Sequence, residues 1–151
     1  MEPVNQPARL AGEASAAKCA PPIVVCLDDD PLVGEIFRAA AARAGVQGVF
    51  LTDAGEFERA IKALAPVAVV LDQVMPDRSG AELILWMRGL ADPPGVIVIG
   101  ADPLYVDSAA ALVKGAGLCF VAALRKPLPV AEFAATIQFA VGAKTRRDPE
   151  R

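Results

Sequence analysis

Acidic residues follow two apolar runs of this sequence, in positions where they could bind a metal ion. Asp28, Asp29 and Asp30 come directly after the run IVVCL, and Asp72 comes directly after the run VAVVL. Carboxylates that lie close together repel one another and raise one another's pKa, so such a cluster is stable mainly with a divalent cation between its members. Hard oxygen ligands of this kind suit Mg²⁺, and we interpret Asp28, Asp29 and Asp72 as candidate Mg²⁺ ligands.

One lysine, Lys126, follows the apolar run at 120–124 and precedes Pro127. An ammonium group beside a bound metal can pair with an anion, and a phosphoryl group is an anion that a metal and a lysine accommodate well together. These residue types therefore predict phosphoryl-transfer chemistry. The Lys126-Pro127 bond is also a candidate for a cis peptide, since X-Pro is the ordinary place for one.

Each of these residues also has a purely structural interpretation. An aspartate before a proline is a good helix N-cap, and we assign that role to Asp30. A cap accounts for only one residue of the acidic triplet, so Asp28 and Asp29 stay metal-ligand candidates. Asp72 could form a turn and Lys126 could be a solvated charge. Their positions directly after apolar strands favour the functional interpretation.

Apolar runs alternate with segments of helical period, and they predict the elements that position these residues. The expected strands cover 23–27, 48–51, 67–71, 96–99 and 120–124, and the expected helices cover 32–44, 56–64, 81–90, 104–114 and 130–141. Strands that are apolar on both faces imply a parallel sheet covered by helices on both sides. We therefore expect an α/β fold with a doubly wound five-stranded parallel sheet, whose site lies at the carboxyl ends of the strands.

Length and composition limit the number of domains and the classes of partner that this chain can have. The chain has 151 residues, of which 54% are hydrophobic and 22% charged, which suits one buried core. We expect a flexible arm at 1–20, one domain at 21–141 and a flexible tail at 142–151. A net charge of −3 gives no electrostatic reason to expect nucleic acid as a partner. No apolar run approaches the ~18–20 residues that span a bilayer and no signal peptide is evident, so we expect a cytoplasmic protein without a membrane partner.

Histidine and cysteine usage narrows the chemistry further. Histidine is absent, which excludes Ser-His-Asp or Cys-His catalysis within this chain. Any chemistry must use carboxylates, lysine and metal. Cys19, Cys26 and Cys119 form no CxxC pair, and we expect them to be packed thiols.

Three motifs, in order, resemble the receiver domains of response regulators in two-component signalling. They are the runs IVVCLDDDPLV, VVLDQVMPDRSG and LRKPL, and the resemblance covers residues 21–141. It implies the (βα)₅ flavodoxin-like receiver fold of a chemotaxis-type single-domain regulator. It also implies that Asp72 is a phosphoacceptor that receives its phosphoryl group from a histidine kinase or a histidine phosphotransfer protein in a phosphorelay.

The resemblance also assigns roles within the site. Mg²⁺ would be held by Asp29 directly, by Asp28 through water, by Asp72 and by the backbone carbonyl of Val74. Lys126 would contact the phosphoryl oxygens. Such a domain is not an enzyme in the ordinary sense, because it catalyses at most its own phosphorylation and dephosphorylation.

Two positions depart from the family pattern. Receivers usually carry Thr or Ser at the end of the fourth strand, where this chain has Gly100, and an aromatic residue three positions before the lysine, where it has Ala123. Acceptor chemistry can survive both changes, and the backbone amide of Ala101 could still contact the phosphoryl group. Tyr105 or Phe120 could replace the missing ring, or could simply pack in the core.

Two further features bear on partners. The run KGAGLCFVAALRKPL and the GAD after the fourth strand resemble receivers associated with EAL-type cyclic-di-GMP phosphodiesterases. The last helix at 130–141 has one charged residue, and we expect Phe133 and Ile137 to face inward while Ala135 and Phe139 face elsewhere. That pattern favours contact with an output protein or with a second copy of the chain, rather than a merely alanine-rich outer face.

Other function classes fit the sequence less well. A degenerate receiver that serves as a binding or dimerisation module is the main alternative, because Gly100 and Ala123 favour it. A phosphohydrolase of the haloacid-dehalogenase type needs a second aspartate two residues after the nucleophile, where this chain has Val74. A dinucleotide-binding domain is disfavoured because no G-x-G-x-x-G follows the first strand.

Overall fold

The computed structural model describes residues 20–72 and 79–147. The strands are β1 (Ile23–Leu27), β2 (Gln47–Leu51), β3 (Ala68–Asp72), β4 (Gly95–Gly100) and β5 (Phe120–Arg125). The helices are α2 (Pro31–Ala44), α3 (Ala54–Leu64), α4 (Gly80–Met87), α5 (Pro103–Gly115) and α6 (Val130–Arg147).

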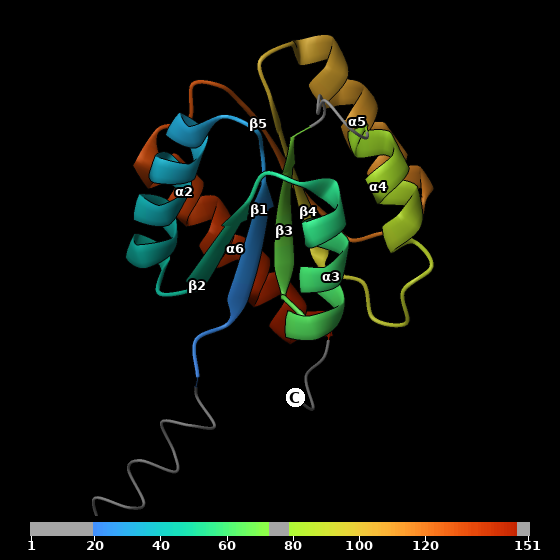
Figure 1. The fold of residues 1–151 in the computed structure, drawn as a ribbon, viewed down its shortest axis with the longest axis horizontal. Coiled ribbons are helices and arrows are strands. Elements are labelled where there is room, and N and C mark those ends of the chain that lie inside the picture. Colours follow the sequence, from blue (N-terminus) through green and yellow to red (C-terminus); the bar gives the residue numbers. More distant parts are fainter. Residues whose placement is uncertain (1–19, 73–78, 148–151) are drawn as a thin grey trace, which may run out of the picture.

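The strands form one parallel sheet in the order β2-β1-β3-β4-β5. Helices α2 and α6 cover one face, and α3, α4 and α5 cover the other (Figure 1). All five strands therefore end at the same edge of the sheet. The predicted doubly wound five-stranded parallel sheet is confirmed.

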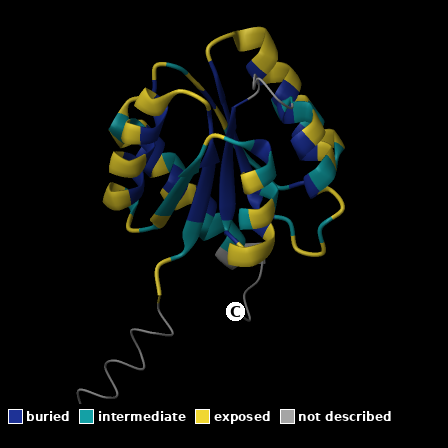
Figure 2. Ribbon diagram, viewed as in Figure 1, coloured by how far each residue is buried: buried dark blue, intermediate teal, exposed yellow. Residues whose placement is uncertain are grey.

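Burial explains why the central strands read as continuous apolar runs. Every residue of β3 and β4 is buried, whereas β2 and β5 at the two edges are largely half-buried (Figure 2). A strand that is covered by helices on both faces has no solvent side, so alternation of polar and apolar residues disappears.

The core consists of two apolar layers, one on each side of the sheet. In the layer under α2 and α6, the rings of Phe37 and Phe133 lie 5.9 Å apart between centroids. Helix α2 also approaches β2 closely, because a Cβ at Gly34 would lie 2.7 Å from Cε2 of Phe50 and one at Gly48 would lie 2.8 Å from Cβ of Ala41. Glycine at these two positions lets the helix and the edge strand touch.

Side chains at the carboxyl edge of the sheet begin several helices. Asp30, Asp53 and Asp102 each accept a backbone N–H from the first turn of the helix that follows, and Ser79 forms a capping box with Glu82 in α4. The N-cap role predicted for Asp30 is confirmed by a 2.9 Å bond from the Leu32 N–H. Several polar side chains of this edge are therefore occupied in holding helix ends.

Two helix ends differ from the sequence pattern. Helix α4 ends at Met87 rather than near residue 90, because Gly89 follows and the chain continues in tight turns. Helix α6 continues to Arg147, beyond the end expected at residue 141. Near its end, Lys144 Nζ lies 2.7 Å from Asp92 Oδ1 in the segment between α4 and β4, and this contact ties the last turns to the domain.

The helix lengths and the cysteine environments bear on two further predictions from the sequence. None of the helices in residues 20–72 and 79–147 is long and apolar enough to cross a membrane. Cys26 is buried in β1 and Cys119 is half-buried, in line with packed thiols. Cys19 lies outside the described residues.

Two phenylalanines on α6 allow a direct test of this packing. Phe133 is fully buried and Phe139 is 56% exposed. We expect Phe133→Ala to lower the free energy of unfolding by about 3–5 kcal/mol, because it removes a ring from the core and leaves a cavity. Phe139→Ala is the matched control and is expected to cost less than about 1 kcal/mol. Urea unfolding measures both, and equal losses would contradict this core assignment.

Candidate functional site

Three carboxylates and one ammonium group meet at the carboxyl edge of the sheet. Asp28 follows β1, Asp72 ends β3 and Lys126 follows β5. Ligand oxygens of Asp28, Asp29 and Asp72 lie within 4.8 Å of one another. Lys126 Nζ lies 2.8 Å from Asp28 Oδ2 and 3.5 Å from Asp72 Oδ2. The structure therefore brings together the four side chains that the sequence analysis singled out.

The Asp28 carboxylate is fully buried, and contacts within the chain hold it in place. Its Oδ1 accepts the Asp30 backbone N–H at 2.9 Å. Its Oδ2 lies 2.8 Å from Lys126 Nζ, and the two groups form an ion pair. Beneath it, burial and the charge of Asp28 raise the pKa of the Cys26 thiol, which stays protonated and packs as an apolar group.

Lys126 is held at the site by its backbone as well as by its charge. Its N–H donates to the Gly100 carbonyl at 2.9 Å, and the peptide bond to Pro127 is cis, as the sequence analysis anticipated. Burial lowers the pKa of Lys126, but the contacts with Asp28 and Asp72 outweigh that effect and the net shift is upward. These ion pairs therefore stabilise the fold at neutral pH, and their contribution is lost only as pH rises through the raised pKa.

The donor set fits a hard divalent cation. Asp28, Asp29 and Asp72 would carry three negative charges when ionised, and Lys126 supplies one compensating positive charge. Carboxylate oxygens at this spacing match the ligand preference of Mg²⁺, which uses few protein ligands and keeps several waters. Asp29 is exposed, so one of the three candidate ligands faces solvent.

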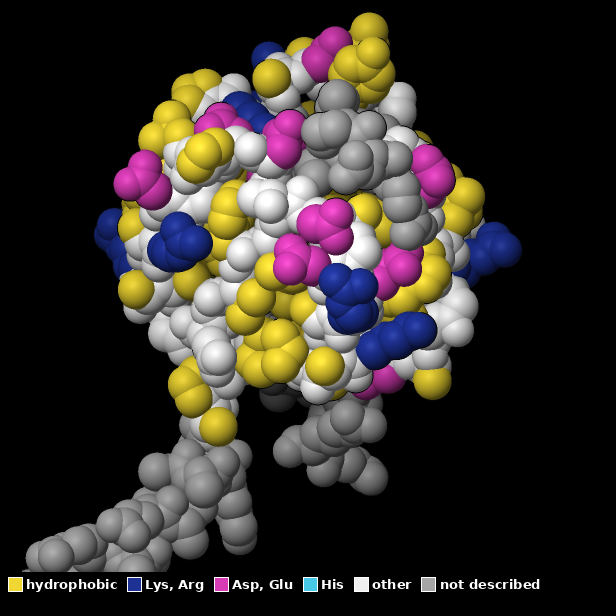
Figure 3. Space-filling model, viewed as in Figure 1, with side chains coloured by type: hydrophobic (Ala, Val, Ile, Leu, Met, Phe, Trp, Pro, Cys, Tyr) yellow, Lys and Arg dark blue, Asp and Glu magenta, His cyan; other side chains and the backbone are white. Residues whose placement is uncertain are grey.

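Charge on the surrounding surface is mixed. On the face shown in Figure 3, acidic and basic side chains are interspersed among apolar ones. Among the described residues, the acids that cluster closely enough for a metal are Asp28, Asp29 and Asp72. Asp30 lies beside them but is committed to the N-terminus of α2.

The other positions that the resemblance singled out lie, in the sequence, near the ends of β3, β4 and β5. Val74 lies outside the described residues. Gly100 is the buried last residue of β4, and Ala101 follows it in an exposed turn. Ala123 is exposed on β5 and presents only a methyl group.

The two candidate replacement rings lie elsewhere. Tyr105 is 52% exposed on α5. Phe120 packs against the core, with Lys114 Nζ 4.7 Å from its ring centroid. Phe120 therefore packs in the core, which is one of the two roles expected for it from the sequence.

Comparison with known proteins supplies the family. The family described as "Response regulator receiver domain" matches residues 24–138. The chain belongs to this family. The chain is 32% identical over 126 residues to the transcriptional regulatory protein KdpE of Mycobacterium tuberculosis. The matched region covers 82% of this chain and 52% of KdpE. The chain thus spans about half the length of these curated relatives.

Solved receiver domains share the fold. The chemotaxis response regulator CheY4 of Vibrio cholerae has a TM-score of 0.69 at 16% identity, covering 80% of this chain and 99% of CheY4. The beryllofluoride-activated NtrC4 receiver domain dimer has a TM-score of 0.68 at 25% identity, covering 81% of this chain and 98% of that chain. The sheet and helix arrangement described above is therefore that of the receiver family.

Two structural features of this receiver escaped the sequence analysis. Val106 of α5 packs over Gly100, and Lys144 pairs with Asp92 at a distance of 52 residues along the chain. The helical pattern of 104–114 marks Val106 as apolar, but it does not say which strand residue it meets. No signal in a single sequence links Lys144 to Asp92.

The metal site can be tested through stability. We expect the wild-type free energy of unfolding to be about 1.4 kcal/mol higher in Mg²⁺ at roughly ten times its Kd than in EDTA, because the ion binds the folded state. Asp29→Asn is expected to lose most of that gain, since it removes one ligand. Asp107→Asn changes an exposed aspartate on α5 and is expected to keep it. Urea unfolding gives the values, and a full gain in Asp29→Asn would argue against Asp29 as a ligand.

Proposed function

We propose that this receiver accepts a phosphoryl group on Asp72 from a phosphohistidine of a kinase or phosphotransfer protein. The observation that supports this most strongly is the contact of Lys126 with both Asp28 and Asp72, beside a third acid that completes a metal-ligand set. The donor imidazole comes from a partner, because this chain has no histidine. Such a partner acts in the cytoplasm, where we place this chain as well.

The reaction is a direct displacement at phosphorus. An oxygen of the Asp72 carboxylate forms the new P–O bond while the P–N bond to the donor imidazole breaks, and the electron pair of that bond returns to the ring nitrogen. Lys126 pairs with phosphoryl oxygens as charge moves toward Asp72. The backbone N–H of Ala101, which follows the end of β4, supplies a further contact to the phosphoryl group.

Mg²⁺ fits the acids that surround Asp72. Asp29 and Asp72 would bind it directly and Asp28 through water, with the Val74 carbonyl as a further ligand. When bound, the ion neutralises charge on the phosphoryl oxygens. Asp28 is oriented for this role by the Asp30 N–H.

A binding module without phosphorylation is the alternative, and Gly100 and Ala123 favour it. Neither residue offers a hydroxyl or a ring at the positions where receivers usually have them. The acids and the lysine favour acceptor chemistry, because a binding module has no use for a cluster of like charges that destabilises the fold without a cation.

Intact-mass spectrometry after incubation with acetyl phosphate and Mg²⁺ distinguishes the two functions. We expect wild type to gain the mass of one phosphoryl group and Asp72→Asn to gain none, because the amide cannot act as the acceptor. Asp107→Asn is expected to gain the same mass as wild type. Absence of the adduct from wild type at every Mg²⁺ concentration would favour the binding module.

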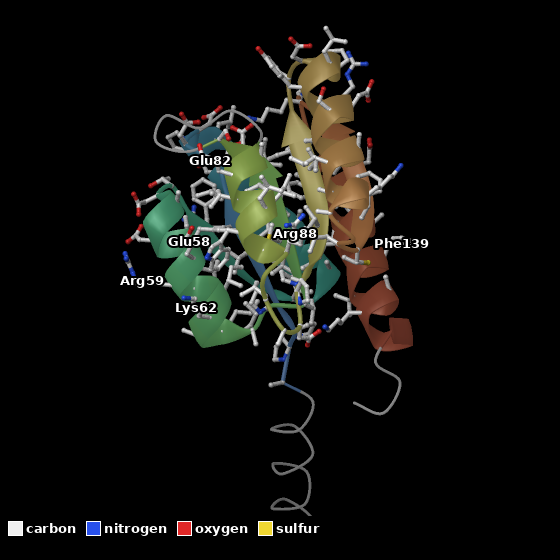
Figure 4. The ribbon with its side chains drawn as sticks, turned by 90° about the vertical axis from the view of Figure 1, so that its right-hand side faces the viewer. Glu58, Arg59, Lys62, Glu82, Arg88 and Phe139 are labelled. Carbon is white, nitrogen blue, oxygen red and sulfur yellow. The ribbon has the colours of Figure 1, made fainter. Side chains whose placement is uncertain are left out.

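Helix α6 is the proposed contact with an output protein or a second copy of the chain. Phe133 and Ile137 face the core as predicted, whereas Phe139 projects from the outer side of α6 (Figure 4). Ala135 is also exposed, so this outer face combines a large ring with small residues. The NtrC4 receiver, which is similar in fold, is described as a dimer in its activated form.

Sedimentation velocity tests self-association through this face. We expect wild type to form a concentration-dependent dimer, and Phe139→Lys to sediment as a monomer because a charge replaces the exposed ring. Leu64→Lys places the same charge at a 38% exposed position on α3 and is expected to leave association unchanged. A wild type that stays monomeric at millimolar concentration would argue for a different partner.

A further inference from the structure

The end of β4 has no side chain, and a residue from α5 fills the space above it. A Cβ built at Gly100 would lie 3.0 Å from Cγ2 of Val106, which is closer than ordinary van der Waals contact. Val106 is 2% exposed. A larger side chain at Gly100 would therefore have to displace Val106, and a phosphoryl group finds no side-chain donor at this strand end.

Helix α5 is already packed closely against the sheet in this state. Asp102 caps its first turn through the Leu104 N–H at 2.9 Å, and the Val106 N–H donates to the Asp102 carbonyl at 3.1 Å. Val106, Ala109 and Val113 form its buried face. Val106 therefore occupies the space over Gly100, and the buried face of the helix already rests on the sheet.

The neighbouring strand offers no movable ring either. Ala123 of β5 is exposed, Tyr105 is exposed on α5, and Phe120 is covered by Lys114. At the position three residues before Lys126, this chain therefore offers a methyl group instead of a ring.

The side of the acceptor site next to α2 contains open space. A groove of about 310 Å³ lies between the start of α2 and the segment after β5, and Lys126 lines it together with Leu32, Ile36 and Leu128. Lys126 Nζ is nearer to Asp28 than to Asp72, at 2.8 Å against 3.5 Å. Added negative charge on Asp72 would draw the ammonium group toward it, and this movement changes the wall of the groove.

We infer that phosphorylation of Asp72 reshapes the groove beside Lys126 and leaves helix α5 in place, because Val106 already fills the space over Gly100. This inference rests on the proposed function. It makes the α2 side of the molecule the surface that reports the phosphorylation state.

Methyl NMR with beryllofluoride and Mg²⁺ as the probe locates the change. Beryllofluoride takes the position of a phosphoryl group on the acceptor carboxylate. We expect the methyl resonances of Leu32, Ile36 and Leu128 to shift several-fold more than those of Leu112 and Val113 on α5. Equal or larger shifts on α5 would overturn the inference.

A paired variant tests the role assigned to Val106. In Gly100→Thr/Val106→Ala, a hydroxyl occupies the strand end and the space above it is opened. We expect beryllofluoride to shift the α5 methyl groups in this variant and not in wild type. An unresponsive α5 in the folded variant would contradict the claim that Val106 is what holds the helix.

Fluorine NMR of the same samples separates this inference from the function on which it rests. A bound beryllofluoride signal that is lost in Asp72→Asn establishes acceptor binding, so the methyl shifts then decide the inference alone. Absence of any bound signal in wild type would overturn the proposed function and the inference together.

Discussion

Like-charge repulsion at the carboxyl edge of the sheet is the constraint on which the rest of the site depends. Asp28 and Asp72 are buried and Asp29 lies beside them, with Lys126 as the ammonium group that contacts the buried pair. Burial strengthens the interactions of Asp28 and Asp72, because water screens these two carboxylates less than it screens exposed ones. Lys126 offsets part of this repulsion, and a bound divalent cation would offset more of it.

The fold supplies this cluster by topology alone. A parallel sheet brings the ends of β1, β3 and β5 to one edge, so residues nearly a hundred positions apart become neighbours. Other acids of that edge have a separate task, since Asp30, Asp53 and Asp102 cap the helices that follow. The same edge therefore holds helix ends through its capping acids and keeps a separate cluster of acids beside Lys126. A groove lies on the α2 side of this edge, and on the α5 side Val106 packs closely over Gly100.

Much of this arrangement is readable from the sequence. Apolar runs predict the strands, and their ends predict Asp28, Asp72 and Lys126 because strand ends are where a parallel sheet exposes side chains. The different burial of Asp28 and Asp29 is not readable, since it depends on which way the chain turns after β1. The packing of Val106 over Gly100 and the pairing of Lys144 with Asp92 depend on helix positions that local patterns do not fix.

The most direct test of the central claim is the chemical identity of the phosphorylated residue. After incubation with acetyl phosphate and Mg²⁺, borohydride reduces an aspartyl phosphate to homoserine, and tandem mass spectrometry locates the modified position. Asp72 as the acceptor predicts homoserine at position 72 and at no other aspartate, with formation lost in EDTA. Homoserine at Asp28 or Asp29 instead, or none at position 72 in the presence of Mg²⁺, would contradict the assignment.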